Sequence, residues 1–371
     1  MGIIGAGLQG RRRAHALSLT HTGHLVGVAS AEAHDAKRLA AEHKAIPFTD
    51  TEELIADPRI DAVLVCTPPD SHKRLSIAAL DAGKHVLCEK PLARTVLEAE
   101  EMVRAARRTG RILWCGWNHR FHPAIQEAKR RFDAGDIGRP LFGRGIYGIG
   151  ARPGTEDEWR ADPAVAAGGH LTEQGIHLVD LYNWILGDFH EVTAMTQQSL
   201  VPMGGMEDSG FVLLRRRDGV VVSVHSALTQ WVNRFDFELF GELGYVRVQG
   251  LGGSYGVEEL TVGFRDDTGP FSAQVIQFRG ADASWGSEWS ELARRITELA
   301  GAPCLPTDPA LDGSAGLTAL RNSHTAYESN STGRTLPLDS LGVLRGDHNS
   351  EEKTRPAKEY SDAPFSGQCQ P

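Results

Sequence analysis

The chain has 371 residues, of which 41% are hydrophobic and 23% are charged, and its formal net charge is −9. This composition is typical of a globular protein, and the length suits two domains. The negative charge disfavours nucleic acids and anionic membranes as main partners, and no apolar run approaches the roughly 20 residues that cross a bilayer. We therefore expect neither a nucleic-acid partner nor a membrane partner.

Two features bear on location, the N-terminus and the cysteines. The segment Met1-Gly2-Ile3-Ile4-Gly5 has no basic stretch followed by an apolar one, so no secretory signal is expected. The five cysteines are odd in number and form no CxxC pair, which favours buried thiols in a reducing compartment. These features predict a cytoplasmic protein.

Apolar strands alternate with helical patterns over the first third of the chain. Such alternation is typical of a parallel sheet that helices cover on both faces. We therefore predict an α/β domain over residues 1–118, with the doubly wound parallel sheet of a Rossmann fold. Its expected strands are 2–4, 25–29, 62–66, 85–88 and 111–115, and its later helices are 36–41, 75–82 and 96–108.

From about residue 140 the pattern changes to strands in succession, with helices expected at 173–186 and about 285–300. Strands joined by hairpins make a mainly antiparallel sheet with helices on one face. Residues 119–340 are therefore predicted to form an α+β domain with an open sheet. Apolar side chains on the uncovered face would pair two sheets, so we expect a homodimer or a homotetramer. The expected strands are 141–149, 191–198, 210–216, 220–227, 235–240, 245–248 and 273–278.

After Leu338 the sequence becomes polar and loses apolar periodicity. Residues 341–371 are rich in charged and small polar side chains, and such segments bury too little apolar surface to fold. They are predicted to form a disordered tail.

The segment Gly5-Ala6-Gly7-Leu8-Gln9-Gly10 is a G-x-G-x-x-G motif that follows a strand and opens a helix. Gly5 permits the tight turn, Gly7 lets the backbone approach a pyrophosphate, and Gly10 lets the helix pack close to the strand. Leu8 and Gln9 begin the helix whose N-terminus faces the phosphates. The motif predicts a dinucleotide site. Few residues precede Gly5, which favours either a short first strand or a start upstream of Met1.

The end of the second strand bears on the choice between NAD and NADP. NAD enzymes usually place Asp or Glu there to bind the ribose hydroxyls, whereas Ser30 occupies the position here. A neutral Ser30 does not repel a 2′-phosphate, but Glu32 is nearby and no adjacent cation is evident. The candidate cations are Arg11, Arg12, Lys37 and Arg38. The sequence leans to NADP and leaves NAD open.

Two further segments carry candidate chemistry. Glu89-Lys90-Pro91 ends a parallel strand, where such sheets bind ligands. On a helix, Glu173, His177 and Asp180 share one polar face by the i, i+4, i+7 rule, apart from an apolar face. His177 is then either a functional side chain, a buried satisfied histidine or a surface residue. Because no third and fourth ligand have suitable spacing, no metal is expected.

Taken together, five segments resemble the glucose–fructose oxidoreductase / inositol dehydrogenase (Gfo/Idh/MocA) family. The resemblance covers residues 2 to about 338, and its most specific parts are Glu89-Lys90-Pro91 and the helix with His177. The segments are the glycine motif at 5–10, Thr67-Pro68-Pro69 with His72, Glu89-Lys90-Pro91, Asn118 to Phe121, and Gly175 to Asp180.

The resemblance implies a role for each matching residue. Lys90 would lie between nicotinamide and the substrate hydroxyl and stabilise a developing alkoxide. His177 would be the general base in oxidation and the acid in reduction. The family usually has Asp where this chain has Glu173, so Glu173 either contacts the substrate or only orients His177. The implied cofactor contacts beyond the glycine loop and Ser30 are Thr67, Pro68, His72, Glu89 and Lys90.

Substrate contacts are expected where the matching segments enter the cleft. These are Asn118, Arg120, Trp159, Arg160 and Asp180. For Arg120 and Arg160 a structural ion pair is an equally weighted alternative.

The sequence thus predicts an NAD(P)-dependent oxidoreductase that transfers hydride between nicotinamide and a carbinol of a sugar, cyclitol or nucleotide sugar. Two alternatives stay open. One is a glycosidase or lyase that retains its cofactor and uses transient internal redox. The other is a binding protein that has kept the fold and lost catalysis.

Overall fold

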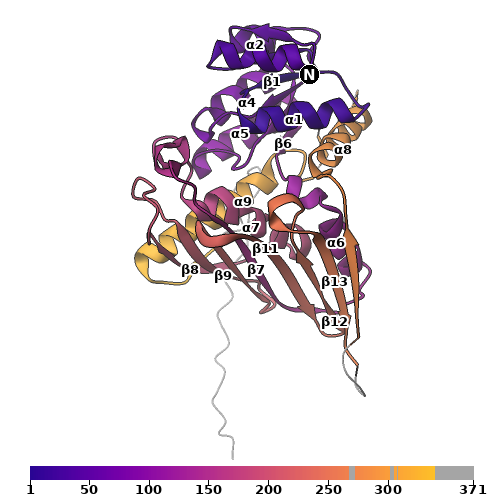
Figure 1. Cartoon of the computed structure of the whole chain (residues 1–371), viewed down its shortest axis with the longest axis vertical. Coiled ribbons are helices and arrows are strands. Elements are labelled where there is room, and N and C mark those ends of the chain that lie inside the picture. The colour runs from indigo at the N-terminus through magenta and orange to yellow at the C-terminus, as the bar shows by residue number, and fades with distance from the viewer. Residues whose placement is uncertain (267–271, 301–304, 307, 339–371) are drawn as a thin grey trace, which may run out of the picture. The chain divides into compact units, whose positions relative to one another are not determined.

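Two β-sheets organise the chain in the computed structural model, which describes residues 1–266, 272–300, 305–306 and 308–338 (Figure 1). The predicted tail at 341–371 lies outside the described residues. Within them, no helix combines the length and the apolarity needed to span a membrane. Cys66, Cys88 and Cys115 are free and buried, as the sequence predicted for its strands.

The first sheet has six parallel strands in the order β3-β2-β1-β4-β5-β6, which confirms the predicted Rossmann topology. Strands β1, β4 and β5 are buried along their whole length, because helices cover both faces. The strand order reverses between β1 and β4, which pair in parallel, and such sheets bind ligands at this place. The strands are β1 (Gly2–Ile4), β2 (Gly27–Ala29), β3 (Ile46–Phe48), β4 (Ala62–Val65), β5 (His85–Cys88) and β6 (Leu113–Cys115).

The helices of this half are α1 (Leu8–Leu19), α2 (Ala33–Glu42), α3 (Thr51–Ala56), α4 (His72–Asp81) and α5 (Val96–Thr109). Sequence analysis did not assign β3 or α3. β3 is an edge strand that is mostly exposed and contains a proline, so it lacks the apolar run that marks the buried strands.

The second sheet has nine strands in the order β14-β13-β12-β11-β7-β10-β9-β8-β15. All its pairs are antiparallel except β7 with β10, which confirms a mainly antiparallel sheet. The strands are β7 (Pro140–Gly150), β8 (Glu191–Gln197), β9 (Ser209–Arg215), β10 (Val221–Ala227), β11 (Thr229–Gly241), β12 (Gly244–Gln249), β13 (Glu258–Phe264), β14 (Ser272–Phe278) and β15 (Leu336–Pro337).

Helices α6 (Pro123–Asp133), α7 (Ile176–Leu186) and α9 (Ser314–Thr332) lie along one face of this sheet (Figure 1). Two glycines of β7 allow α7 to lie close. A Cβ atom at Gly143 would stand 2.7 Å from Tyr182, and one at Gly145 would stand 3.0 Å from Leu178. The absent side chains therefore set the distance between α7 and the sheet.

The prediction of one continuous helix over 173–186 was wrong in its first turn. Residues Leu171–Gly175 form a π-helical turn, and α7 begins only at Ile176. The buried Glu207 accepts hydrogen bonds from the backbone N–H groups of Gly169 and Leu171, at 3.2 and 2.9 Å. These bonds fix the chain just before the wide turn, which often marks a functional segment.

Helix α8 (Ser284–Glu298) packs against α1, although the two are far apart in sequence. Trp289 and Leu292 of α8 share the buried core of the first sheet with Ile3 and Leu17. The C-terminal half of the chain thus completes the core of the N-terminal sheet. The expected domain boundary near residue 118 stays a prediction.

Candidate active site

The glycine loop has the geometry that a bound pyrophosphate needs. Gly5 has a positive φ of 102°, and a Cβ atom there would lie 2.7 Å from the carbonyl oxygen of Cys66. A Cβ atom on Gly10 would stand 1.9 Å from the Gly5 carbonyl oxygen, so α1 packs directly on the loop. Around Gly7 nothing lies within 4 Å of the missing Cβ atom. The open space is at the helix N-terminus, which fits an anionic group.

The polar groups beside this loop are partly engaged. The Ser30 hydroxyl accepts a hydrogen bond from the Ala6 N–H at 3.4 Å. Of the candidate cations, Arg38 is ion-paired with Asp35 at 2.7 Å. The Gln9 carbonyl Oε1 is buried and finds no hydrogen-bond partner among the described residues. Leu8, at the first position of α1, is exposed.

His72 links two loops at the carboxyl edge of the sheet. Its side chain is buried, and its ring nitrogens lie 3.0 Å from the Pro91 carbonyl oxygen and 2.8 Å from the Thr67 carbonyl oxygen. Burial lowers the pKa of His72. A neutral His72 can donate to only one of the two carbonyl oxygens, but both nitrogens face the protein, so His72 would serve a cofactor by positioning Thr67 and Pro68.

The Glu89 side chain is part of a buried ion pair and does not face open space. Its Oε1 accepts from Arg13 Nε at 2.7 Å, and Arg13 also pairs with Glu288 of α8 at 2.5 Å. Sequence analysis did not foresee that a member of the run Arg11-Arg12-Arg13 is buried, since such runs usually face solvent. The carboxylate of Glu89 therefore anchors the loop that carries Lys90.

Lys90, Glu173 and Arg160 form one charged cluster. Lys90 Nζ donates to Glu173 Oε2 at 2.5 Å and also to the Glu173 carbonyl oxygen. Arg160 Nε donates to Glu173 Oε1 at 2.8 Å, and its guanidinium lies 4.4 Å from the Trp159 ring centre. Burial alone would raise the pKa of Glu173, but the two cations outweigh burial and lower that pKa to about 2. Glu173 is thus a carboxylate that holds Lys90.

His177 is a buried, neutral imidazole beside this cluster. Only 3% of the residue is exposed, and its ring stacks on His119 with centres 3.7 Å apart. Burial lowers the pKa of His177 well below its ordinary value, and the charges of His119 and Lys90 act in the same direction. Its Nδ1 is buried and has no hydrogen-bond partner in the part of the chain that the structure describes.

Asp180 and Arg120 satisfy one another. Arg120 donates to both carboxylate oxygens of Asp180, at 2.7 and 2.5 Å, and both residues are buried. Burial raises the pKa of Asp180, while Arg120 opposes that shift. Arg120 and Asp180 thus form an ion pair of the kind that the sequence left open for Arg120. The substrate-binding role predicted for both residues stays a prediction.

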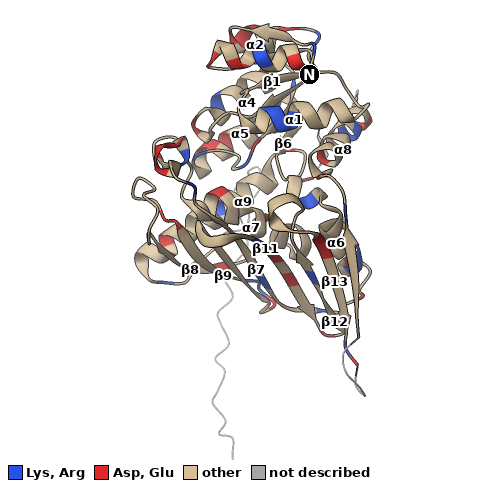
Figure 2. Cartoon of the chain, viewed as in Figure 1, with Lys and Arg blue, Asp and Glu red and all other residues tan. Residues whose placement is uncertain are grey.

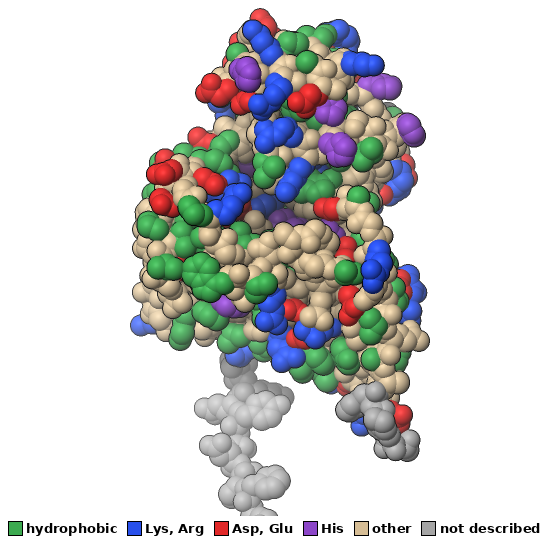
Figure 3. Space-filling model, in the orientation of Figure 1, with side chains coloured by type: hydrophobic (Ala, Val, Ile, Leu, Met, Phe, Trp, Pro, Cys, Tyr) green, Lys and Arg blue, Asp and Glu red, His purple; other side chains and the backbone are tan. Residues whose placement is uncertain are grey.

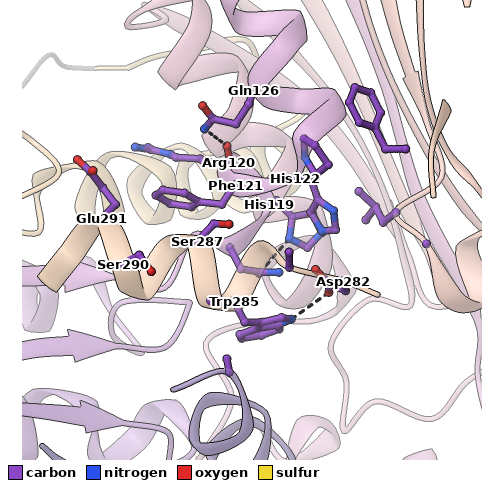
Figure 4. A pocket seen from close by; sticks show the side chains of 18 of the residues that line it. His119, Arg120, Phe121, His122, Gln126, Asp282, Trp285, Ser287, Ser290 and Glu291 are labelled. Carbon is purple, nitrogen blue, oxygen red and sulfur yellow. Dashed lines mark hydrogen bonds between the residues drawn. The ribbon is translucent and has the colours of Figure 1, made fainter. Parts of the chain in front are cut away.

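A groove of about 1940 Å³ adjoins the site (Figures 3 and 4). Figure 3 shows a hollow near the middle of this side of the molecule, with blue Lys or Arg and purple His side chains in it. Asn118, Arg120, His119 and Tyr147 line the groove, whereas Lys90, Glu173 and His177 are not in its lining. His119 stands between the groove and His177, and sequence analysis missed it because nothing in the run Asn118 to Phe121 indicates ring stacking.

Comparisons with known proteins bear on the family and the fold. The family model "Oxidoreductase family, NAD-binding Rossmann fold" (GFO_IDH_MocA) matches residues 1–117, and the model "GFO/IDH/MocA C-terminal domain" matches residues 125–247. A 1,5-anhydro-D-fructose reductase of Ensifer adhaerens is 34% identical over 66% of this chain and 73% of its own length. A myo-inositol 2-dehydrogenase of Thermotoga maritima is 27% identical over 92% of this chain and 99% of its own length.

Among solved structures, a levoglucosan dehydrogenase in complex with NADH and levoglucosan has the same fold. Its TM-score is 0.82 at 24% identity, and the match covers 91% of this chain and 99% of the other. The two family models together reach residue 247, and the Thermotoga maritima relative matches 92% of the chain. The chain belongs to the Gfo/Idh/MocA family of NAD-binding oxidoreductases.

Proposed function

We propose that this protein is an NAD(P)-dependent dehydrogenase or reductase that transfers hydride between nicotinamide and a carbinol carbon of a sugar or cyclitol. The relatives named above act on anhydrofructose, inositol and levoglucosan. The observation that supports the proposal best is the pair formed by the Lys90 ammonium and the neutral His177 imidazole. This pair lies at the carboxyl edge of the sheet that carries the open glycine loop.

The proposed roles follow from the charges. A bound nicotinamide supplies or accepts the hydride. The Lys90 ammonium stabilises negative charge on the substrate oxygen, and Glu173 holds that ammonium in place. His177, already neutral, accepts the carbinol proton in oxidation and returns it in reduction.

The test is to replace Lys90 and His177 singly by alanine and to follow the absorbance of reduced nicotinamide. myo-Inositol, 1,5-anhydro-D-fructose and levoglucosan are the first substrates to screen. Each variant is expected to lose at least ~100-fold in kcat, as removal of a general acid–base or an alkoxide-stabilising group does. Cofactor binding, measured by thermal shift, should persist. Full turnover with alanine at either position would contradict the roles. Sugar cleavage without net formation of reduced nicotinamide would instead indicate a cofactor-retaining glycosidase or lyase.

For the cofactor we propose that NADP is accepted as well as NAD. Support comes from Ser30, a neutral side chain that stands where NAD enzymes place an acid. The variant Ser30→Asp should lower kcat/KM for NADP by at least ~10-fold through charge repulsion and affect NAD less. Equal effects on both cofactors would show that position 30 does not face the 2′-position.

We also propose that the open face of the second sheet pairs two copies of the chain. The strand register, continued through β10, puts apolar side chains of β7, β8 and β9 on this same face, away from the helices. They are Phe142, Met195, Phe211 and Leu213, which are 40%, 73%, 48% and 50% exposed. Charged positions lie on the neighbouring strands of the sheet (Figure 2), and Arg144 and Arg247 both contact Glu238, at 2.9 and 3.2 Å. Exposed apolar surface bordered by charges is typical of subunit interfaces.

A further inference from the structure

The ring of His119 covers one face of His177. His119 lies in the short turn Asn118–Phe121 after β6, and 6% of the residue is exposed. The two rings are nearly parallel, with 22° between their planes and 3.7 Å between their centres. Trp117 approaches His177 edge-on, at 5.7 Å. Water therefore has little access to the His177 ring from these sides.

The hydrogen bonds of His119 determine which of its nitrogens carries the proton. Nδ1 lies 3.2 Å from Asn118 Oδ1, which can only accept, because Asn118 Nδ2 donates to Ser284 Oγ at 3.0 Å. His119 Nδ1 must therefore donate. Nε2 is then the acceptor for the Tyr147 hydroxyl, 3.1 Å away. Both ring nitrogens of a neutral His119 therefore have hydrogen-bond partners.

The charged groups around His177 disfavour its protonated form. Lys90 follows β5, His119 lies in the turn after β6 and His122 follows that turn; a positive charge on any of them opposes a positive charge on the His177 ring. His122 faces Glu258 of β13 at 2.9 Å.

The nearby carboxylates are already engaged in ion pairs. Glu173 pairs with Lys90 and Arg160, and Asp180 pairs with Arg120. Tyr147 of β7 keeps its proton, because burial raises its pKa well above the ordinary value.

We propose that His119 is a positioning residue that keeps His177 as a neutral imidazole and leaves its Nε2 for the substrate. His177 Nδ1 is sealed from solvent and has no hydrogen-bond partner within the described residues, so Nε2 is the nitrogen that can exchange a proton. The proposal rests on the acid–base role proposed for His177. In this proposal, the ring of His119 keeps His177 neutral, and His119 itself takes no part in the reaction.

The test is an NMR titration of the full chain labelled with ¹⁵N in histidine, with the His177 signal assigned from a His177→Gln variant. In the wild type, His177 should stay neutral between about pH 5.5 and 8. In His119→Ala, water reaches the ring, and the pKa of His177 should rise by at least about one unit toward the ordinary ~6.5. In His119→Phe, the ring cover persists, and His177 should stay neutral.

Two results would overturn the proposal: titration of wild-type His177 near pH 6.5, or the same titration of His177 in the wild type and in His119→Ala. Should His119→Ala fail to fold, His119→Gln replaces it, since its amide can reach Asn118 or Tyr147 but cannot stack as a ring. The NMR titration does not depend on enzymatic turnover. Failure of the His119 proposal can therefore be distinguished from failure of the proposed function, which the alanine variants of Lys90 and His177 test. In an active enzyme, the acid limb of the kcat/KM profile should move to higher pH in His119→Ala.

Discussion

At the scale of single residues, the position of Glu173 changes how the site is understood. The family usually has the shorter Asp there, and the sequence left open whether the longer side chain contacts substrate or orients His177. In this structure the carboxylate bridges Lys90 and Arg160, and its role toward substrate stays a prediction. A longer side chain can reach two cations at once, and this fixes the ammonium that is proposed to stabilise the alkoxide.

The variant Glu173→Gln should lower kcat by at least ~10-fold, because the amide keeps the shape but loses the charge that holds Lys90. Stopped-flow or steady-state reduction of nicotinamide measures the change. Glu158→Gln is the matched control: Glu158 also pairs with Arg160, at 3.1 Å, but its side chain is 34% exposed and it does not contact Lys90. An equal loss in both variants would show that Arg160, and not Lys90, carries the effect.

At the scale of elements, the glycines where the glycine loop meets α1 have different roles, one in packing and one in ligand binding. Gly10 has no room for a methyl group, because the Gly5 carbonyl oxygen would stand 1.9 Å away. Gly7 has open space on the side where a Cβ atom would project, and its neighbour Leu8 starts the helix. One glycine is therefore required by packing, whereas the other is required only if a ligand occupies the space.

Gly10→Ala should destabilise the protein by more than ~2 kcal/mol, as overpacking against backbone does, and should lower the midpoint of urea unfolding. Gly7→Ala should change stability by less than ~1 kcal/mol yet weaken NAD(P) binding by at least ~10-fold. Cofactor affinity is measured by fluorescence titration. Unchanged affinity in Gly7→Ala would show that the pyrophosphate does not approach this residue.

At the scale of the whole molecule, buried charges join segments that are distant in sequence. Arg13 of α1 binds Glu89 next to Lys90 and Glu288 of α8, and Trp114 Nε1 donates to Glu288 at 3.1 Å. Burial raises the pKa of Glu288, against the effect of Arg13. The arginine thus connects the first helix, the loop of the proposed catalytic lysine and the C-terminal half.

Replacing Arg13 by alanine leaves two buried carboxylates without their cation and should destabilise the fold by about 3–5 kcal/mol. The control is Arg12→Ala, one residue earlier on an exposed position of α1, which should cost less than ~0.5 kcal/mol. Chemical unfolding of both variants gives the comparison. Similar stability in the two would mean that the protein accommodates the unpaired carboxylates by protonation.

The proposed pairing of two copies of the chain is also a property of the whole molecule. Leu213→Arg places a charge in the middle of the open sheet face and should shift the protein to a smaller assembly, as light scattering after size exclusion measures. Leu97→Arg alters an equally apolar side chain, 71% exposed on α5, and should leave the assembly unchanged. A monomeric wild type would contradict the proposed pairing of sheets.

The sequence predicted the elements whose burial is uniform or strictly alternating. The runs at 62–66 and 85–88 are recognisable because both faces of a parallel strand are apolar, and the alternation over 210–227 indicates an open antiparallel sheet. It missed β3, β13, β15, α3, α6 and α9. Helix α9 has small and polar residues at many of its buried positions, so its apolar periodicity is weak.

Local patterns in the sequence by themselves determined the fold class, the glycine loop and the identities of Lys90, Glu173 and His177, because strand periodicity and motif spacing involve neighbours along the chain. Only the tertiary structure decided what these groups face. Lys90 is held by a carboxylate from position 173, Arg13 is buried by α8, and His177 is covered by His119. Each of these contacts joins residues that are 58 to 275 positions apart in the chain. Charge and desolvation act through space, and no pattern of neighbours along the chain encodes them.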